Sequence, residues 1–85
     1  MTRRRPAPFT DRPIHNRVAR LRADRGLTRL ELAEAVGVHY QTVGYIERGE
    51  YAPSLHVALR IAETLDLPVE VVFSTERFDE RQIGT

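Results

Sequence analysis

The stretch ELAEAVGVHYQTVGYIERG, residues 31–49, contains the pattern that decides the fold. Its apolar residues recur at helical spacing, and they are Leu32, Ala33, Val36, Val43 and Ile46. Gly37 is placed to end a helix of about two turns, and Gly49 to end a second helix. Only about three or four residues separate the two predicted helices, which is the spacing of a helix-turn-helix. In that arrangement the second helix projects into the DNA major groove.

One helix is predicted before this pair. Its apolar residues lie at helical spacing, and they are Ile14, Val18 and Leu21. Gly26 is placed to end it, and Thr28 with Glu31 then forms the capping-box pattern that begins the next helix. The first helix is therefore expected to begin near Ile14.

Two helices are predicted after the pair. Ser54 is the expected N-cap of the fourth helix, and Pro68 lies in the first turn of a short fifth helix. The residues expected to face inward from the fourth helix are Leu55, Ala58, Leu59, Ala62 and Leu65. The fifth helix leads to the apolar residues 71–73. No pattern predicts a pair of strands, so the expected fold class is all-α, a compact domain of five short helices.

The length of the chain limits it to one domain. At 85 residues it can bury a single small core, which is expected over residues 14–74. Residues 1–13 contain three prolines and a run of three arginines, and they are expected to form a flexible basic arm. Residues 75–85 are then a C-terminal extension available for contact with a second copy or another protein.

Several classes of protein are excluded by composition. Cysteine is absent, which excludes a disulfide framework and thiolate metal sites and makes a reducing cytoplasm the expected compartment. No apolar run approaches the roughly 20 residues of a membrane span, and the N-terminus lacks the apolar stretch of a signal peptide. We expect a cytoplasmic protein with no membrane contact and no cofactor or metal.

Charge is distributed unevenly along the chain. Residues 1–48 carry ten arginines against five acidic residues, whereas residues 49–85 carry three arginines against seven. The basic first half suggests an anionic partner and leaves the acidic second half for other contacts. All thirteen basic residues are arginine, which suits phosphate recognition, although genome composition produces the same bias.

The exposed face of the predicted third helix is polar and aromatic. The residues expected on it are His39, Tyr40, Gln41, Gly44 and Tyr45, with Thr42 on its flank. Gln41 can donate and accept together, which matches the major-groove edge of adenine. A tyrosine can hydrogen-bond a phosphate or base, or pack on a thymine methyl. The alternative is a solvated face whose tyrosines shield apolar surface.

Gly44 and two arginines also fit the interpretation of the third helix as a DNA-contacting surface. Glycine costs roughly 1 kcal/mol in a helix interior relative to alanine, which is tolerable if it lets the backbone approach the groove. Arg29, in the first turn of the second helix, and Arg48, after the third, are placed where side chains meet DNA phosphates. Each arginine could instead be a solvated surface charge.

Between Asn16 and Ser74 the sequence resembles the Xre/Cro-like helix-turn-helix family of lambda-type phage repressors. The segments that carry the resemblance, in family order and spacing, are GLT at 26–28, ELAEAVGV at 31–38, QTV at 41–43, IERG at 46–49 and PSL at 53–55. The resemblance implies a five-helix lambda repressor-like domain. It also implies a homodimer that binds operator DNA and controls transcription, most simply as a repressor at an inverted repeat.

The resemblance assigns roles to particular residues. The base contacts that it implies are Tyr40, Gln41, Gly44 and Tyr45, and the phosphate contacts are Arg29, Thr42 and Arg48. It further implies a partly buried ion pair between Arg22, at the end of the first helix, and Glu47 in the third. Glu47 is therefore expected to be structural, because a buried carboxylate paired with arginine is not free to contact a base.

Three residues depart from the family pattern. Arg29 stands where glutamine is usual, which favours a charge contact. His39 stands where serine or threonine usually caps the third helix; it is expected to touch a phosphate, and a protonated ring there would strengthen binding at mildly acidic pH. Glu50 stands where a basic residue is common, which should weaken attraction to the DNA backbone.

The two ends of the chain are the expected sites of further contacts. Two-fold pairing would space two recognition helices about 34 Å apart, one turn of DNA. The residues proposed for this dimer interface are Val69, Phe73, Phe78 and Ile83, although Phe73 could simply complete the core. Arg3, Arg4 and Arg5 could follow a minor groove or act as a non-specific electrostatic tether.

The sequence also bears on two other functions. An enzyme is not expected, because the three histidines lie far apart in the sequence and no nucleophile has a base at a recognisable spacing. The stronger alternative is an antitoxin-type or protein-interaction regulator. In that case the C-terminal segment STERFDERQIGT, residues 74–85, would bind another protein, and DNA binding would serve autoregulation.

Overall fold

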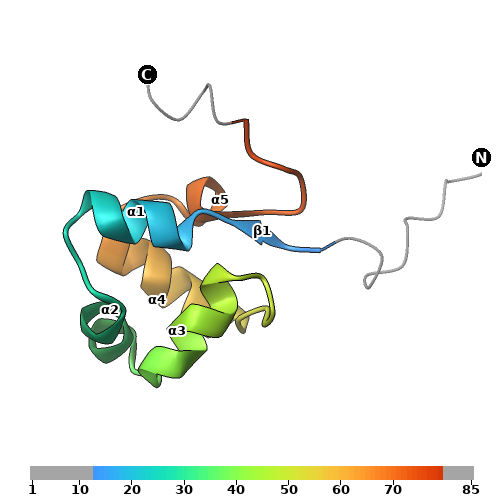
Figure 1. The fold of residues 1–85 in the computed structure, drawn as a ribbon. Coiled ribbons are helices and arrows are strands. Elements are labelled where there is room, and N and C mark those ends of the chain that lie inside the picture. Colours follow the sequence, from blue (N-terminus) through green and yellow to red (C-terminus); the bar gives the residue numbers. More distant parts are fainter. Residues whose placement is uncertain (1–12, 80–85) are drawn as a thin grey trace, which may run out of the picture.

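Five helices and a two-stranded sheet make up the part of the chain that the computed structural model describes, residues 13–79. In chain order the elements are β1 (His15–Asn16), α1 (Val18–Asp24), α2 (Arg29–Val36), α3 (Tyr40–Glu47), α4 (Leu55–Leu65), α5 (Val69–Val72) and β2 (Phe73–Ser74). In Figure 1, α2 and α3 lie at the bottom of the domain, and α4 lies between this pair and α1. The five-helix architecture predicted from the sequence is confirmed.

Side-chain caps begin α2 and α4 where the sequence predicts them. The Thr28 hydroxyl accepts a hydrogen bond from the Glu31 N–H at 3.0 Å, and the Glu31 carboxylate accepts one from the Thr28 N–H at 2.8 Å. This reciprocal pair satisfies two donors that a helix N-terminus would otherwise leave unpaired. At the start of α4 the Ser54 hydroxyl accepts from the Val57 N–H at 3.2 Å.

Gly37 ends α2 and sets the direction of α3. Its φ of 89° lies in the left-handed region, where a residue with a Cβ is strained. From that conformation the Gly37 N–H still donates to the Ala33 carbonyl at 2.8 Å, so the last turn of α2 is closed. The chain then reverses within a few residues, and α3 packs directly against α2.

A single core holds the helices together. Its buried residues come from all five helices, and they are Val18, Leu21, Leu32, Ala33, Val36, Val43, Ile46, Ile61, Ala62, Leu65 and Val72. The apolar residues predicted for α2 and α3 are all in this set. Val69 and Phe73 are partly buried and pack against it. Since each short helix buries only one face, the core is complete only when the helices come together.

The predicted helical start at Ile14 is wrong, as is the expectation that the chain contains no strand pair. Residues 15 and 16 are extended and pair antiparallel with β2, with His15 opposite Ser74 and Asn16 opposite Phe73. The reason is that α1 begins only at Val18, whose N–H donates to the Asn16 side-chain oxygen at 2.9 Å. The sheet is small, and the domain remains essentially helical.

The predicted inward face of α4 is partly wrong. Leu55 and Leu59 are 72% and 43% exposed, whereas Ile61, absent from the prediction, is completely buried. The apolar residues of α4 extend round much of its circumference, so the helical period permits more than one inward face. Packing against α2 and α5 selects the side with Ile61, Ala62 and Leu65. With 11 residues α4 is the longest described helix, and none of the helices between residues 13 and 79 could span a bilayer.

Candidate nucleic-acid interface

The outer face of α3 is polar and aromatic. Val43 and Ile46 point into the core and are at most 1% exposed, while Tyr40 and Tyr45 on the other side are 49% and 46% exposed. Gln41 is exposed beside Tyr40. This division follows the helical period, because positions 43 and 46 share one face. The two tyrosines and the glutamine are therefore available to a partner.

A shallow hollow of about 220 Å³ gathers most of the predicted contact residues. The residues that line it are Arg29, Tyr40, Gln41, Gly44, Tyr45 and Arg48. Six of the eight residues predicted to touch bases or phosphates thus share one surface, although they come from α2, α3 and the residue after α3. His39 and Thr42 do not line this hollow.

A neighbouring hollow adds a residue that the sequence analysis missed. Thr42, Tyr45, Glu50 and Tyr51 line a second depression of about 440 Å³, and Tyr51 is 52% exposed. Tyr51 lies outside the helical pattern, so periodicity gave it no role. The available signal was an aromatic residue directly after the exit of α3.

The expectation that Gly44 presents bare backbone on the exposed face is wrong. Gly44 is buried in the monomer, and the side chain that covers it belongs to Arg48. A Cβ built on Gly44 would lie 3.2 Å from Arg48 Nη1. Long side chains in helices lie over the preceding turn, so a residue four positions later covers this site.

Arg48 is held in place by two neighbours. Its Nε donates to the Glu50 carboxylate at 3.2 Å, and its guanidinium carbon lies 5.3 Å from the centre of the Tyr45 ring. The second distance is within the range of a cation–π contact. Glu50, which departs from the family pattern, therefore positions an arginine beside α3.

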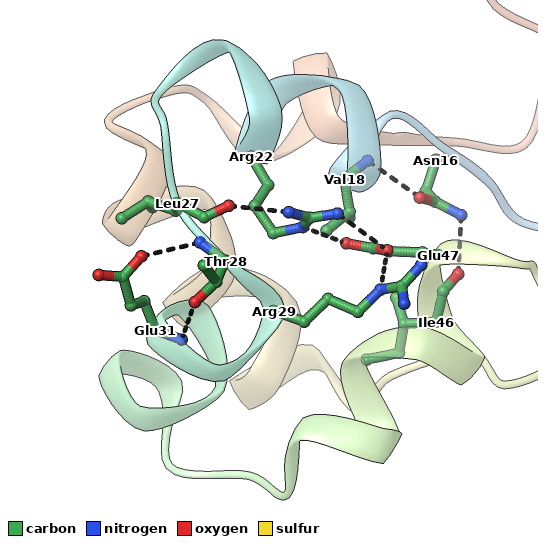
Figure 2. Close-up of polar contacts among 9 residues, drawn as sticks. All are labelled: Asn16, Val18, Arg22, Leu27, Thr28, Arg29, Glu31, Ile46 and Glu47. Carbon is green, nitrogen blue, oxygen red and sulfur yellow. Dashed lines mark hydrogen bonds and ion pairs between the residues drawn. The ribbon is translucent and has the colours of Figure 1, made fainter.

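Glu47 lies between two arginines, as Figure 2 shows. Arg22 Nε donates to Glu47 Oε2 at 2.7 Å, so the ion pair predicted between these residues is present. Arg29 Nε donates to Glu47 Oε1 at 2.8 Å, a contact that the sequence analysis did not foresee. The Glu47 side chain is 2% exposed, and those of Arg22 and Arg29 are 16% and 50% exposed. One carboxylate therefore joins α1 and α2 to the end of α3.

Asn16 ties the same end of α3 to the start of α1. Its side-chain amide nitrogen donates to the Ile46 carbonyl at 2.9 Å, while its oxygen accepts from the Val18 N–H (Figure 2). The Ile46 carbonyl is in the last turn of α3, where helix carbonyls lack partners within the helix. Asn16 is thus a second anchor for α3.

Residues 18–72, from the first residue of α1 to the last of α5, match the helix-turn-helix family. The chain belongs to this family, in its Xre and lambda-repressor type. It is 46% identical over 63 residues to YgzD of Bacillus subtilis (strain 168), an uncharacterized HTH-type transcriptional regulator; the match covers 74% of this chain and 96% of YgzD. An uncharacterized HTH-type transcriptional regulator of Archaeoglobus fulgidus is 36% identical over 70 residues, which cover 82% of this chain and 96% of the relative.

Two solved structures have a fold similar to that of this chain. The restriction-modification controller protein C.AhdI from Aeromonas hydrophila superposes with a TM-score of 0.61 at 33% identity, over 64% of this chain and 82% of that one. A DNA-binding protein from Bacteroides fragilis, described as putative, gives a TM-score of 0.66 at 24% identity, over 72% of this chain and 98% of that one. The second likeness concerns the fold alone. The helix-turn-helix of this family is the DNA-binding unit, and here it consists of α2 and α3.

His39 caps the recognition helix of this helix-turn-helix domain. Its Nδ1 accepts a hydrogen bond from the Gln41 N–H at 3.1 Å, and its ring stacks on Tyr40 with centroids 4.9 Å apart. A doubly protonated imidazole has no acceptor nitrogen, so protonation would break this cap. The phosphate contact expected for His39 stays a prediction. The neutral ring, with its proton on Nε2, keeps both the cap and a donor.

The residues predicted for dimer contacts fall in different environments of the helix-turn-helix domain. Val69 and Phe73 are partly buried against the core. Phe78 is half-buried, with the Arg17 guanidinium carbon 4.2 Å from its ring centre. Ile83 and the arm residues Arg3, Arg4 and Arg5 lie outside the described residues. Between residues 13 and 79, no group of three or more histidine, aspartate and glutamate side chains could hold a metal ion.

Proposed function

We propose that this protein is a sequence-specific transcriptional regulator that places α3 in the major groove of operator DNA. The observation that carries the proposal is the hollow on α3, which exposed Tyr40, Gln41 and Tyr45 line together with Arg29 and Arg48. Uncharged donors and acceptors beside guanidinium groups match the base edges and phosphates that the major groove presents together. The opposite face of α3 is buried, so only this face can enter a groove.

Each exposed residue has a role that fits its chemistry. Gln41 is suited to adenine, whose N6 donates and N7 accepts. Tyr40 and Tyr45 supply a hydroxyl for a base or phosphate and a ring for a thymine methyl. Thr42 and the Nε2–H of neutral His39 can donate to phosphate oxygens.

Arg29 is oriented for a phosphate contact. Its Nε is engaged by Glu47, and its Nη atoms form no hydrogen bond within residues 13–79. Those two nitrogens present paired donors that match a phosphate. Because the Glu47 carboxylate also binds Arg22, it restricts the rotamers of Arg29 without cancelling both positive charges.

A homodimer on an inverted repeat is the assembly that we propose, with repression as the simplest outcome of operator occupancy. A groove of about 460 Å³ is lined by Leu55, Val69, Phe73 and further apolar residues, and Leu55 is 72% exposed. An exposed leucine beside an apolar groove is suited to the same surface of a second copy. Phe78 is proposed as a further dimer contact, and the roles predicted for Ile83 and for Arg3, Arg4 and Arg5 stay predictions, because these residues lie outside the described part of the chain.

The experiment is selection of binding sites from a random duplex library by the purified protein, followed by affinity measurements at several salt concentrations. The expected result is enrichment of an inverted repeat. Arg29→Ala should make the slope of log K against log salt shallower by about one unit, since one phosphate contact is lost. Arg60→Ala, which removes an arginine on α4 away from the hollow, is the control for net charge.

Two results would overturn the proposal. Binding without sequence enrichment would leave the helix-turn-helix as a scaffold or as a surface for another protein. An equal loss of slope in Arg29→Ala and Arg60→Ala would mean that net charge, and not a contact at α2, attracts the DNA. In either case the C-terminal segment 74–85 would be tested for a protein partner.

A further inference from the structure

Position 44 of the recognition helix has no side chain of its own, and the guanidinium of Arg48 lies in the space that one would occupy. Arg48 Nη1 is 3.2 Å from the position of an added Cβ, and Cζ and Nη2 are each 3.9 Å from it. The Arg48 side chain is nonetheless 49% exposed. The guanidinium therefore covers the middle of α3 while it remains accessible from outside.

The direction of the side chain and two contacts define this placement. Arg48 is the C-cap residue of α3, and its side chain follows the usual direction of helical residues towards the N-terminal turn. Glu50 holds Nε at 3.2 Å, and the Tyr45 ring faces the guanidinium carbon at 5.3 Å. A side chain restrained in this way loses less conformational entropy when it binds.

We propose that Arg48 reads a guanine, and that it acts as the base-contacting side chain that position 44 lacks. This inference rests on the proposed function and concerns the same face of α3. With Nε engaged by Glu50, Nη1 and Nη2 remain as donors, and neither forms a hydrogen bond within residues 13–79. Guanine presents two acceptors, O6 and N7, to the major groove, which is the pattern that paired arginine donors match.

The carboxylate of Glu50 beside the Arg48 guanidinium favours a contact with a base over a contact with a phosphate. Glu50 lies 3.2 Å from Arg48 Nε, so the pair as a whole is close to neutral. A phosphate beside this pair would meet a carboxylate as well as a guanidinium, and much of the attraction would cancel. A directional hydrogen-bond pair to a base depends less on net charge. The sequence-based assignment of Arg48 to a phosphate is replaced in this proposal.

Gly44 and Glu50 are positioning residues in this arrangement. Gly44 leaves room for the guanidinium, and Glu50 fixes its orientation through Nε. Alanine at position 44 would push the Arg48 guanidinium outward by a few tenths of an ångström, because a 3.2 Å contact is too close for carbon and nitrogen. Base discrimination would then change without loss of a contact residue.

The test compares site selection and competition titrations for the wild type and Arg48→Lys. Lysine keeps the charge but cannot offer two fixed donors. We expect one guanine in each half-site of the wild-type consensus, preferred over other bases by roughly 5- to 150-fold. Arg48→Lys should abolish that preference while the salt slope and the rest of the consensus remain. The matched control is Arg60→Lys, an arginine on α4 outside the hollow, which should leave the consensus and the affinity unchanged.

A second pair of variants tests the positioning residues. Gly44→Ala and Glu50→Gln should each weaken the same guanine preference, while urea unfolding shows a domain at least as stable for Gly44→Ala, since alanine favours the helix. A simple structural role would not alter the choice of one base. The proposal is therefore separated from general damage to α3.

The results of these experiments distinguish failure of the guanine assignment from failure of the proposed function. If the wild type selects an inverted repeat whose consensus is identical in Arg48→Lys, the guanine assignment is overturned and the regulator remains. If Arg48→Ala lowers affinity equally for all sites and reduces the salt slope by about 0.9, Arg48 is a phosphate contact. If the wild type selects no sequence at all, both proposals fail.

Discussion

Glu47 at the end of α3 accepts a hydrogen bond from Arg22 of α1 at 2.7 Å, and this contact fixes the recognition helix to the rest of the domain. The carboxylate is almost fully buried, and the arginine is largely so. Arg22 also donates to the Leu27 carbonyl at 2.8 Å, so the same guanidinium holds the connection between α1 and α2. The Arg22–Glu47 pair thus contributes both to the orientation of α3 and to the closure of this connection.

Glu47→Ala is expected to destabilise the domain by about 3–5 kcal/mol, because it leaves Arg22 largely buried without its counter-ion. Arg29 adds little to this cost, since it is half exposed and can be solvated. Urea unfolding followed by circular dichroism measures the free energy. The control is Glu63→Ala, whose pair with Arg60 is 3.9 Å apart with a 75% exposed carboxylate, and which should cost below about 1 kcal/mol. Equal losses in the two variants would contradict a structural role for Glu47.

Gly37→Ala is expected to cost about 1–2 kcal/mol, since the backbone there has a φ of 89° and alanine is strained in that region. Gly44→Ala is the matched comparison, because Gly44 is helical and alanine gains up to about 1 kcal/mol in a helix. Only the far end of the flexible Arg48 side chain must move to admit the methyl group. Thermal or urea unfolding of both variants should therefore give shifts of opposite sign, and a larger loss in Gly44→Ala would refute the assignment.

His39→Ala is expected to cost about 1 kcal/mol, because the Gln41 N–H loses the acceptor that caps α3. His39→Ser should be at least as stable as the wild type, since serine is a preferred N-cap residue. Urea titration at neutral pH distinguishes the three proteins, and Ser54→Ala, which removes the cap of α4, gives the scale for losing one cap. If alanine and serine at position 39 were equally stable, the histidine cap would contribute nothing.

Leu55→Asp is expected to weaken dimerisation at least tenfold without unfolding the monomer, because Leu55 is 72% exposed yet lines the apolar groove proposed for the second copy. Sedimentation equilibrium without DNA measures the dissociation constant. Leu30→Asp is the matched control, since Leu30 is a 54% exposed leucine on α2, away from that groove. If Leu30→Asp weakened dimerisation as much as Leu55→Asp, the dimer contact would lie elsewhere. If the wild type were monomeric at all concentrations, the dimer would be excluded.

The helix pair could be predicted because its signals are local. The Thr28–Glu31 capping box and the left-handed turn at Gly37 depend on residues within one or two turns, and so does the helical spacing of the buried residues. The exposed face of α3 follows from the same spacing. The Arg22–Glu47 pair spans 25 residues, and it was predicted from the family resemblance and not from any local pattern.

The sequence by itself therefore determined the five helices, the helix-turn-helix and the face of α3 that meets solvent, because short-range sterics and capping decide these. Only the tertiary structure decided that Asn16 is extended against Phe73, that Leu55 is exposed, and that Arg29 shares Glu47 with Arg22. The tertiary structure also decided that the Arg48 side chain covers Gly44. Each of these depends on where a side chain points once distant segments have packed, and hydrophobic periodicity carries no information about that direction.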